Sequence, residues 1–357
     1  MPQRVFPDFL LREWLFLGSV AGLVLTSIYR GRIPSYSIGD AEVVFVLGTL
    51  FIAVKGLERS GLLAWLSARI EKGRFLALKL VATTFFLSML VTNDVALVAL
   101  VPLTLALDVR RRDLLVILEA LAANAGSALT PFGNPQNLFI YWFYGLDPAE
   151  FIATIAPFSL LFLVLFVLFA LWIRVPAVAV SSRSPVLAGR RALVYGGLLL
   201  TVILTVLRLL PVETGLVVLV YALLFDRGSL RIDYALLFTL VCFFGITDNL
   251  KSLLEASLAH SGHIFLFSAL SSQLISNVPA ALLFADFTDQ WRALLWGTSV
   301  GGFGGLLGSL ANLIAYKLYT ASESTGDSAA FTAKFMLFSY VAFFIGIAQF
   351  FLLAALA

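Results

Sequence analysis

Four polar segments interrupt an otherwise apolar sequence, and they form two matched pairs. In each half of the chain, a short segment with Asn beside a hydroxyl residue precedes a longer segment rich in Gly and Asn. We name them by their residues: the first tip is Thr92, Asn93 and Asp94, the first break is residues 130–137, the second tip is Ser276 and Asn277, and the second break is residues 301–312. Hydrocarbon offers no water to a freed backbone group, so such interruptions persist only inside protein or around a polar cavity. The two pairs therefore predict a binding site.

The breaks carry the groups with which interrupted helices bind ions. A helix broken inside a membrane presents a positive N-terminus on one side and free carbonyl oxygens on the other, which suit an anion and a cation respectively. Oxygen-only shells fit sodium or another hard cation. The alternative for the glycines of the second break is tight helix packing. The polar groups of the first break are Asn134, Gln136 and Asn137, those of the second are Ser309 and Asn312, and Thr92 and Ser276 place hydroxyls beside the tip asparagines.

Asp94 is the only carboxylate between Glu71 and Asp108, and the second tip has Val278 in its place. An ionisable residue at membrane depth costs roughly 3 kcal/mol or more if it is charged and unpaired. We therefore predict that Asp94 carries a coupling proton or helps to hold a cation. The alternative is that its carboxylate caps the N-terminus of the following helix.

Lysine and arginine are missing from the stretches that hold these segments: residues 80–109, 114–173, 252–291 and 293–316. An anion bound there would lack a counter-charge from a side chain. It must then arrive with bound cations, sit on helix N-termini, or be protonated or neutral. This favours ion-coupled transport over an anion channel ringed by arginines.

The elements that position these residues must be membrane helices. The 357 residues are 61% hydrophobic and 13% charged, with a mean hydropathy of +0.99, which no water-soluble surface could accommodate. The net charge of +3 reflects orientation in the membrane rather than a nucleic-acid partner. Cys242 is the single cysteine, which excludes a disulfide framework. We interpret the N-terminal apolar run as a retained span.

Apolar runs of roughly 20 residues fit a hydrocarbon core of ~30 Å. We predict nine spans, at 12–29, 41–57, 114–143, 151–173, 192–210, 212–226, 233–249, 293–319 and 331–356. Two of them, 114–143 and 293–319, contain the breaks. The stretches 75–107 and 264–285 place the tips between short apolar arms, so we predict each to be a re-entrant hairpin. Two ordinary spans are the alternative for 75–107.

The basic residues predict the orientation of these spans. With the N-terminus inside, 19 of the 24 Lys and Arg fall on the cytoplasmic side. The two hairpins then enter from opposite sides, which is typical of transporters built from inverted repeats. The predicted fold is an all-α polytopic membrane protein with a first repeat at 1–173, shortened by one span, a cytoplasmic linker at 174–191 and an inverted second repeat at 192–357. Each repeat contains a re-entrant hairpin and a broken transmembrane helix.

Other charged residues do not indicate a metal centre or an enzyme. His260 and His263 have no acidic or Cys partner nearby in the sequence, which favours a solvated loop over a metal site. Asp248, Lys251 and Glu255 are expected to be surface or interfacial charges. Because the chain has no HExxH motif and no credible Ser–His pair at membrane depth, we predict no catalysis and no cofactor other than a coupling ion.

The segments VTNDVALVALVP, LAANAGSALTPFGNPQNLFIY, SQLISNVPAALLF and GGFGGLLGSLANLIAY resemble the ion transporter superfamily. Its members include arsenite-efflux permeases, divalent anion–sodium symporters, citrate transporters and some sodium/proton antiporters. The resemblance implies that the two tips and the two breaks form the substrate and sodium sites, and that the protein forms a homodimer. The candidate binding residues that it implies are Thr92, Asn93, Asp94, Thr130, Gly133, Asn134, Asn137, Ser276, Asn277, Gly305, Gly308, Ser309 and Asn312, with sodium expected at Asn93, Gly133, Asn277 and Gly305. Asn-Asp at the first tip is more similar to the arsenite-permease and antiporter branches than to the Ser-Asn-Thr tips of dicarboxylate symporters.

These features predict a secondary active transporter in the cytoplasmic (inner) membrane, with the N-terminus inside. It would move a small anion or oxyanion, arsenite-like or carboxylate-like, by alternating access coupled to sodium or protons. The close alternative is a sodium/proton antiporter without organic cargo, and a channel is a third class. The expected partners are the small anion and the lipid bilayer, with no nucleic acid.

Overall fold

A computed structural model describes residues 14–70, 75–107, 111–173, 189–258, 263–322 and 327–356. Within these ranges the chain forms helices and connecting loops, without a strand. The α-helices are α2 (Trp14–Arg30), α3 (Ile38–Arg59), α4 (Leu62–Ile70), α5 (Leu76–Val91), α6 (Asn93–Ala106), α7 (Arg112–Ser127), α8 (Pro135–Phe143), α9 (Pro148–Trp172), α10 (Gly189–Val206), α11 (Gly215–Phe225), α12 (Tyr234–Leu258), α13 (Ile264–Ile275), α14 (Asn277–Ala285), α15 (Trp291–Gly301), α16 (Leu310–Ala321) and α17 (Ser328–Leu356). Short 3-10 helices lie at Val212–Thr214, Arg227–Leu230 and Leu306–Gly308.

Each predicted span corresponds to one helix or to a broken pair of helices. The span predicted at 114–143 is divided into α7 and α8, and the span at 293–319 is divided into α15 and α16. The intervening residues, 128–134 and 302–309, are not α-helical. The predicted interruptions are therefore confirmed. The short helix α4, between α3 and α5, is an element that the sequence pattern did not predict.

Each tip joins a pair of short helices through a single residue. Thr92 alone separates α5 from α6, and Ser276 alone separates α13 from α14, and the two helices of each pair contact each other. At 1.5 Å per residue, the 12 residues of α13 and the 9 of α14 extend for roughly 18 and 14 Å, which is less than a core of ~30 Å. The 16 residues of α5 and the 14 of α6 reach roughly 24 and 21 Å. These lengths favour hairpins over ordinary spans; their depth in a membrane stays a prediction.

The surface of the bundle is that of a polytopic membrane protein. Four helical segments of the described chain are long and apolar enough to cross a membrane: α9, α10, α17 and Tyr234–Lys251 within α12. Large apolar side chains such as Leu168 and Phe344 are 59% and 63% exposed, as expected where hydrocarbon is the solvent. The ion pairs between described residues mostly involve residues at or near helix ends and in the adjoining loops. They are Arg32–Asp248, Lys251–Asp286, Arg292–Glu150, Lys55–Glu58, Arg59–Asp226 and Lys334–Asp113.

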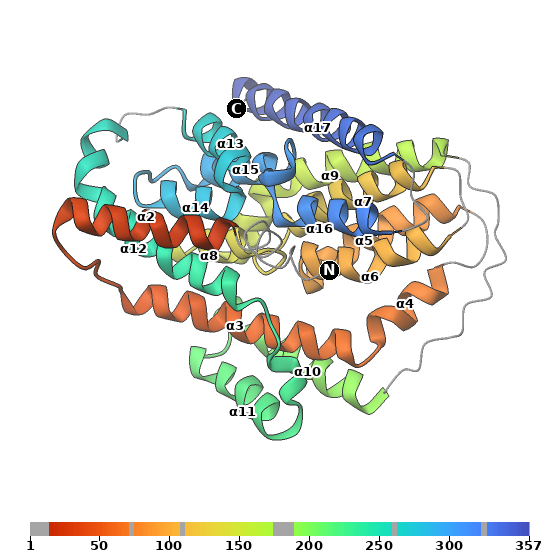
Figure 1. The fold of residues 1–357 in the computed structure, drawn as a ribbon, viewed down its shortest axis with the longest axis horizontal. Helices are drawn as coiled ribbons and strands as arrows, with labels where there is room; N and C mark the ends of the chain where they lie inside the picture. Colours follow the sequence, from red (N-terminus) through yellow and green to blue (C-terminus); the bar gives the residue numbers. More distant parts are fainter. Residues whose placement is uncertain are drawn as a thin grey trace, which may run out of the picture.

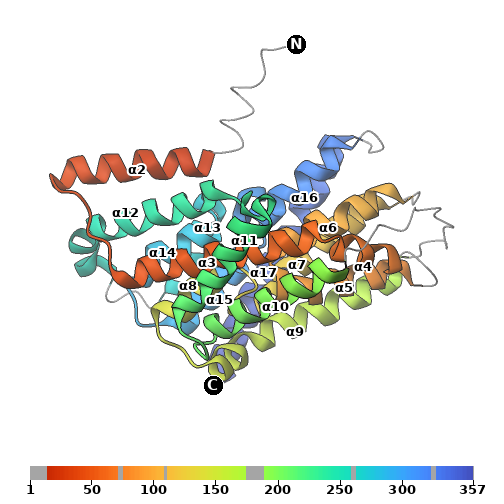
Figure 2. The ribbon, with the colours of Figure 1, turned by 90° about the horizontal axis from the view of Figure 1, so that it is seen from below.

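The helices of the two halves interlock around the tips and breaks. Figures 1 and 2 show α3, α10 and α11 lying together beside the main bundle of α5–α9 and α13–α17, while α2 packs on α12. Within the bundle, α6 contacts α16, and α14 contacts α8. The helix that follows each tip thus packs on the helix that follows the break of the other half. These contacts between the two halves bring both tips and both breaks to one region.

Some sequence predictions concern residues outside the described ranges. They are most of the linker at 174–191, His260, the side chain of Glu255 and several basic residues used for the orientation. The division into two repeats and the side of the N-terminus therefore stay predictions. Asp248 pairs with Arg32, which follows α2, and Lys251 pairs with Asp286, which follows α14; their interfacial position stays a prediction. His263 is exposed.

Candidate functional site

The two tips share the same uncommon backbone conformation. Thr92 has φ 77° and ψ 154°, and Ser276 has φ 72° and ψ 157°. Residues other than glycine rarely adopt these angles, which cost of order 1–3 kcal/mol. In both cases an asparagine, Asn93 or Asn277, begins the next helix. Matching strain at matching positions indicates that the surrounding protein holds both bends in place, and this marks the tips as a candidate site.

Two asparagines close the first break. Asn134 caps α8, because its side-chain oxygen accepts a hydrogen bond from the backbone N–H of Asn137 at 2.9 Å. The end of α7 leaves carbonyl oxygens without helical partners. The Asn137 amide donates to three carbonyls of this region, those of Ser127, Ala128 and Thr130, at 3.2, 2.8 and 3.0 Å. Asn137 therefore stabilises the shape of the break and is itself fully buried.

Thr130 and Gly133 fasten the first break to the first hairpin. The Thr130 hydroxyl donates to the carbonyl of Met89 in α5 at 2.8 Å. The backbone N–H of Asn93 donates to the Gly133 carbonyl at 3.3 Å. A Cβ atom at Gly133 would lie 2.2 Å from the Ser127 carbonyl oxygen, so this close approach requires glycine.

Three polar side chains perform the same tasks in the second break. Ser309 caps α16 by accepting a backbone hydrogen bond at 3.3 Å. Asn312 donates to the carbonyls of Gly302 and Gly305 at 3.0 and 3.1 Å. Gln273 of α13 accepts a hydrogen bond from the Gly305 N–H at 2.7 Å and so fastens this break to the second hairpin. Both breaks are therefore ordered by side-chain amides that replace missing backbone partners.

The glycines of the second break have different roles. Gly304 has φ +82°, a conformation that favours glycine. A Cβ atom at Gly308 would lie 2.6 Å from the carbonyl oxygen of Phe303. At Gly301, by contrast, a Cβ atom would lie 2.4 Å from the Ser272 hydroxyl of α13. Tight helix packing, the alternative considered for these glycines, thus applies to Gly301.

Asn124 of α7 connects the first tip to the second break. Its side-chain oxygen accepts hydrogen bonds from the Asn93 amide at 3.1 Å and from the Ser309 hydroxyl at 3.0 Å. Its amide nitrogen donates to the Asn312 side-chain oxygen at 2.9 Å. Asn124 is only 5% exposed, so these bonds are made away from bulk water. A single buried side chain thereby links segments from both halves.

Residues of both tips and both breaks line one small cavity of about 40 Å³. The predicted residues on its wall are Asn93, Asp94, Ser276, Asn277 and Ser309. The first break contributes Pro135 and Gln136 to the same wall. The other predicted residues behave differently: Thr92 lines the neighbouring cavity described next, whereas Thr130, Gly133, Asn134, Asn137, Gly305, Gly308 and Asn312 line neither of the two.

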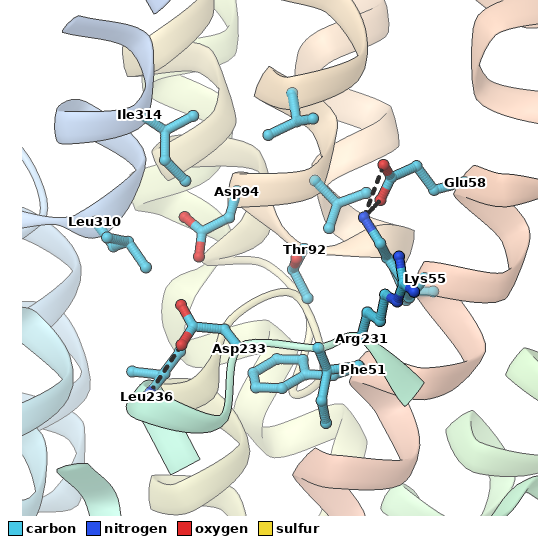
Figure 3. Close-up of a pocket in the computed structure, with 14 residues that line it drawn as sticks. Phe51, Lys55, Glu58, Thr92, Asp94, Arg231, Asp233, Leu236, Leu310 and Ile314 are labelled. Carbon is cyan, nitrogen blue, oxygen red and sulfur yellow. Dashed lines mark hydrogen bonds and ion pairs between the residues drawn. The ribbon is translucent and has the colours of Figure 1, made fainter. Parts of the chain in front are cut away.

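A second cavity of about 210 Å³ also reaches Asp94 (Figure 3). Its wall includes Lys55 and Glu58 near the end of α3, and Arg231 and Asp233 before α12. Figure 3 shows the carboxylates of Asp94 and Asp233 pointing toward each other across the cavity. Asp94 lines both cavities and therefore lies between them.

The geometry does not support the capping role considered for Asp94. The Oδ1 atom of Asp94 is buried and has no hydrogen-bond partner among the described residues. Its backbone N–H is instead capped by the Asn93 side-chain oxygen at 3.0 Å. The carboxylate is thus available to a proton or a cation.

The expected sodium ligands have internal partners in this conformation. The Gly133 carbonyl accepts one hydrogen bond, and the Gly305 carbonyl accepts two, from Asn312 and from the Gly308 N–H. The Asn93 and Asn277 side chains lie on the wall of the small cavity. The four-residue sodium site stays a prediction, because binding through both glycine carbonyls requires some of these bonds to be exchanged.

Three residues of the site were missed by the sequence reasoning. Asn124 stands in a run of small residues within LAANAGSALTPFGNPQNLFIY, and a lone amide in such a run was a usable signal. Gln273 precedes the second tip by three residues and offered a similar signal. Asp233 gave none, because it lies in a polar segment before α12 that is distant in sequence from both tips.

Known proteins that resemble this chain include membrane transporters. The profile of the citrate transporter family matches residues 9–301. The inner membrane protein YbiR of Escherichia coli is 37% identical over 301 residues, which cover 78% of this chain and 80% of that protein. An uncharacterized transporter of Methanocaldococcus jannaschii is 30% identical over 324 residues, covering 88% and 91%. The silicon efflux transporter LSI3 of rice, Oryza sativa subsp. japonica, is 34% identical over 170 residues, covering 43% of this chain and 34% of that protein.

Proposed function

Because this chain belongs to the citrate transporter family and is a membrane transporter rather than an enzyme, we propose that it moves a small anion or oxyacid by ion-coupled alternating access. The cavity shared by the tips and breaks is the proposed cargo site. The observation that carries this proposal is the convergence of Asn93, Ser276, Asn277 and Ser309 on that cavity, whose described lining contains no lysine or arginine. Amides and hydroxyls bind oxygen-rich solutes through hydrogen bonds without fixing a strong charge.

The dimensions of the cavity favour a small cargo. A cavity of about 40 Å³ has room for about three water molecules, since each water molecule needs at least about 10–15 Å³ of cavity volume. A small inorganic oxyanion or neutral oxyacid fits such a space better than a tricarboxylate. Family resemblance supports both classes, because the family is named for citrate and one relative is named for silicon efflux.

A sodium/proton antiporter without organic cargo is the second candidate. Among the described residues, the Oδ1 atom of Asp94 has no hydrogen-bond partner and no basic residue lines the small cavity, and both observations favour this candidate. A carboxylate in this position suits a cation better than an anion. In both candidates the transporter lies in the cytoplasmic membrane with the N-terminus inside and is built from two inverted repeats. Opposed hairpins meeting near the midplane are the arrangement expected of such repeats.

Flux into proteoliposomes distinguishes the two candidates. We expect uptake of at least one labelled oxyanion or oxyacid from a panel of arsenite, silicic acid, succinate and citrate, with dependence on sodium or on a proton gradient. The antiporter predicts instead a pH change inside the vesicles on addition of sodium alone, with no uptake from the panel. Large passive currents in electrical recordings would contradict both and indicate a channel.

A further inference from the structure

The cavity of about 210 Å³ places two carboxylates from distant parts of the chain opposite each other. Asp94 projects from the start of α6, and Asp233 projects from the residue before α12 (Figure 3). Asp233 and its neighbour Arg231 are exposed, whereas Asp94 is half-buried. The cavity therefore leads from the protein surface at Asp233 to Asp94, where it adjoins the proposed cargo site.

The charges on the wall of this cavity do not balance unless a proton is bound. Lys55 is neutralised by Glu58, since its ammonium lies 2.8 and 3.0 Å from the two carboxylate oxygens. Arg231 then remains to balance both Asp94 and Asp233. The α16 side of the wall contributes only the apolar Leu310 and Ile314. One proton on the carboxylate pair brings the whole wall to zero net charge.

The hydrogen-bond partners of the Asp94 and Asp233 carboxylates differ, and this difference bears on where a proton between them would lie. The Asp233 carboxylate accepts a hydrogen bond from the Leu236 N–H at 3.0 Å at the start of α12. The buried Asp94 oxygen has no such partner, so a negative charge there is costly. The nearest other buried carboxyl in α6 and α7 is Glu119, which binds Thr104 about 15 Å further along α6.

We propose that Asp94 and Asp233 share a single coupling proton, with Asp233 exchanging it between the surface and Asp94. The proposal rests on the ion coupling of the proposed function and names the residues that perform it. The proton leaves the Asp233 carboxyl group and joins the Asp94 carboxylate, so the pair keeps one negative charge throughout. Water in the cavity, which is large enough to hold it, carries the proton across any gap. A neutral Asp94 no longer repels an anion in the adjoining small cavity, which couples the two movements.

The test is a titration of purified protein in lipid nanodiscs by infrared difference spectroscopy, which detects protonated carboxyl groups and needs no cargo. The wild-type protein is expected to show a titrating carboxyl band that Asp94→Asn removes. Asp233→Asn should move the midpoint of this band by about one pH unit toward acid, because the neighbouring negative charge is gone. Arg231→Gln should move it toward alkaline pH. Glu42→Gln is the matched control, since Glu42 lines a separate cavity at the other end of α3 and should leave the midpoint unchanged.

An unchanged midpoint in Asp233→Asn and Arg231→Gln, with both proteins folded, would overturn the proposal. A band that responds to sodium but not to pH would do so too, since the pair would then hold sodium. If Asp233→Asn does not fold, the Arg231→Gln midpoint decides. Cargo flux is measured separately on the same proteins. If the carboxyl band titrates as expected but no compound of the panel is transported, the proposed cargo is wrong and the shared proton still stands. If cargo is transported but the midpoints of Asp233→Asn and Arg231→Gln equal that of the wild type, the shared proton is wrong and the proposed function still stands.

Discussion

Asn124→Ala is the most informative perturbation of the site, because this side chain joins the first tip to the second break. The substitution leaves three buried groups without their shared partner: Asn93 Nδ2, Ser309 Oγ and Asn312 Oδ1. Each lost bond costs about 1–3 kcal/mol. Water from the adjoining cavity of about 40 Å³ can replace some of them, so we take about 1 kcal/mol each and ~3 kcal/mol in total. This corresponds to roughly a 100-fold change in an equilibrium between conformations.

The assay combines flux and stability. We expect Asn124→Ala to lower the initial rate of proteoliposome uptake by roughly 100-fold if the three bonds form in one transport state and not in the other. The matched control is Asn249→Ala, since Asn249 is also a buried asparagine but binds Thr26 and Ser27 of α2, away from the cavities. This control should lose thermal stability while keeping most of its transport.

A double-mutant cycle tests whether the hydrogen bond between Asn124 and Asn312 contributes to transport. Because Asn124 and Asn312 share a hydrogen bond, the combined substitution to Ala should cost less than the sum of the two single substitutions. Additive effects, or a wild-type rate in Asn124→Ala, would show that the connection between the halves does not contribute to transport.

Three further predictions follow from the tips and the first break. Asn93→Ala and Asn277→Ala should each reduce uptake at least tenfold while folded protein still reaches the membrane, and normal uptake in both variants would refute the site. Thr92→Gly should be about 1 kcal/mol more stable to thermal unfolding than Thr92→Ala, because glycine relieves the strain of φ 77°; equal stabilities would mean that the bend is not strained. Gly133→Ala should prevent the first break from adopting its native conformation, because the added Cβ atom would lie 2.2 Å from a carbonyl oxygen. The control Gly197→Ala adds its Cβ atom to open space on an exposed face of α10 and should be neutral or slightly stabilising. Monodisperse, folded Gly133→Ala protein with full transport would contradict this prediction.

Local sequence determined where the helices stop. Pro135, the glycines and the side-chain amides cannot continue an apolar helix without unpaired backbone groups, so the breaks could be placed to within a few residues. The hydroxyl–Asn pairs located both tips at the residue where the helix direction changes. Because these signals depend only on neighbours along the chain, they required no knowledge of the tertiary structure.

Tertiary structure decided what each polar side chain does. Asn137 and Asn312 were predicted as binding residues, yet their amides are engaged by backbone carbonyls, while Asn93 and Asn277 line the cavity. Such a choice depends on which acceptors lie within about 3 Å in space, and sequence spacing does not specify this distance across a bend.

Contacts between segments that are distant in the sequence also could not be predicted from sequence spacing. Asn124 meets Asn312 because α7 packs on α16, and Asp233 faces Asp94 because the start of α12 lies beside the first tip. Propensity and periodicity describe single helices, whereas the partners of a buried polar group follow from how helices from both halves pack together. The sequence by itself thus determined which segments are polar and interrupted, and the packing alone determined that they meet in one region.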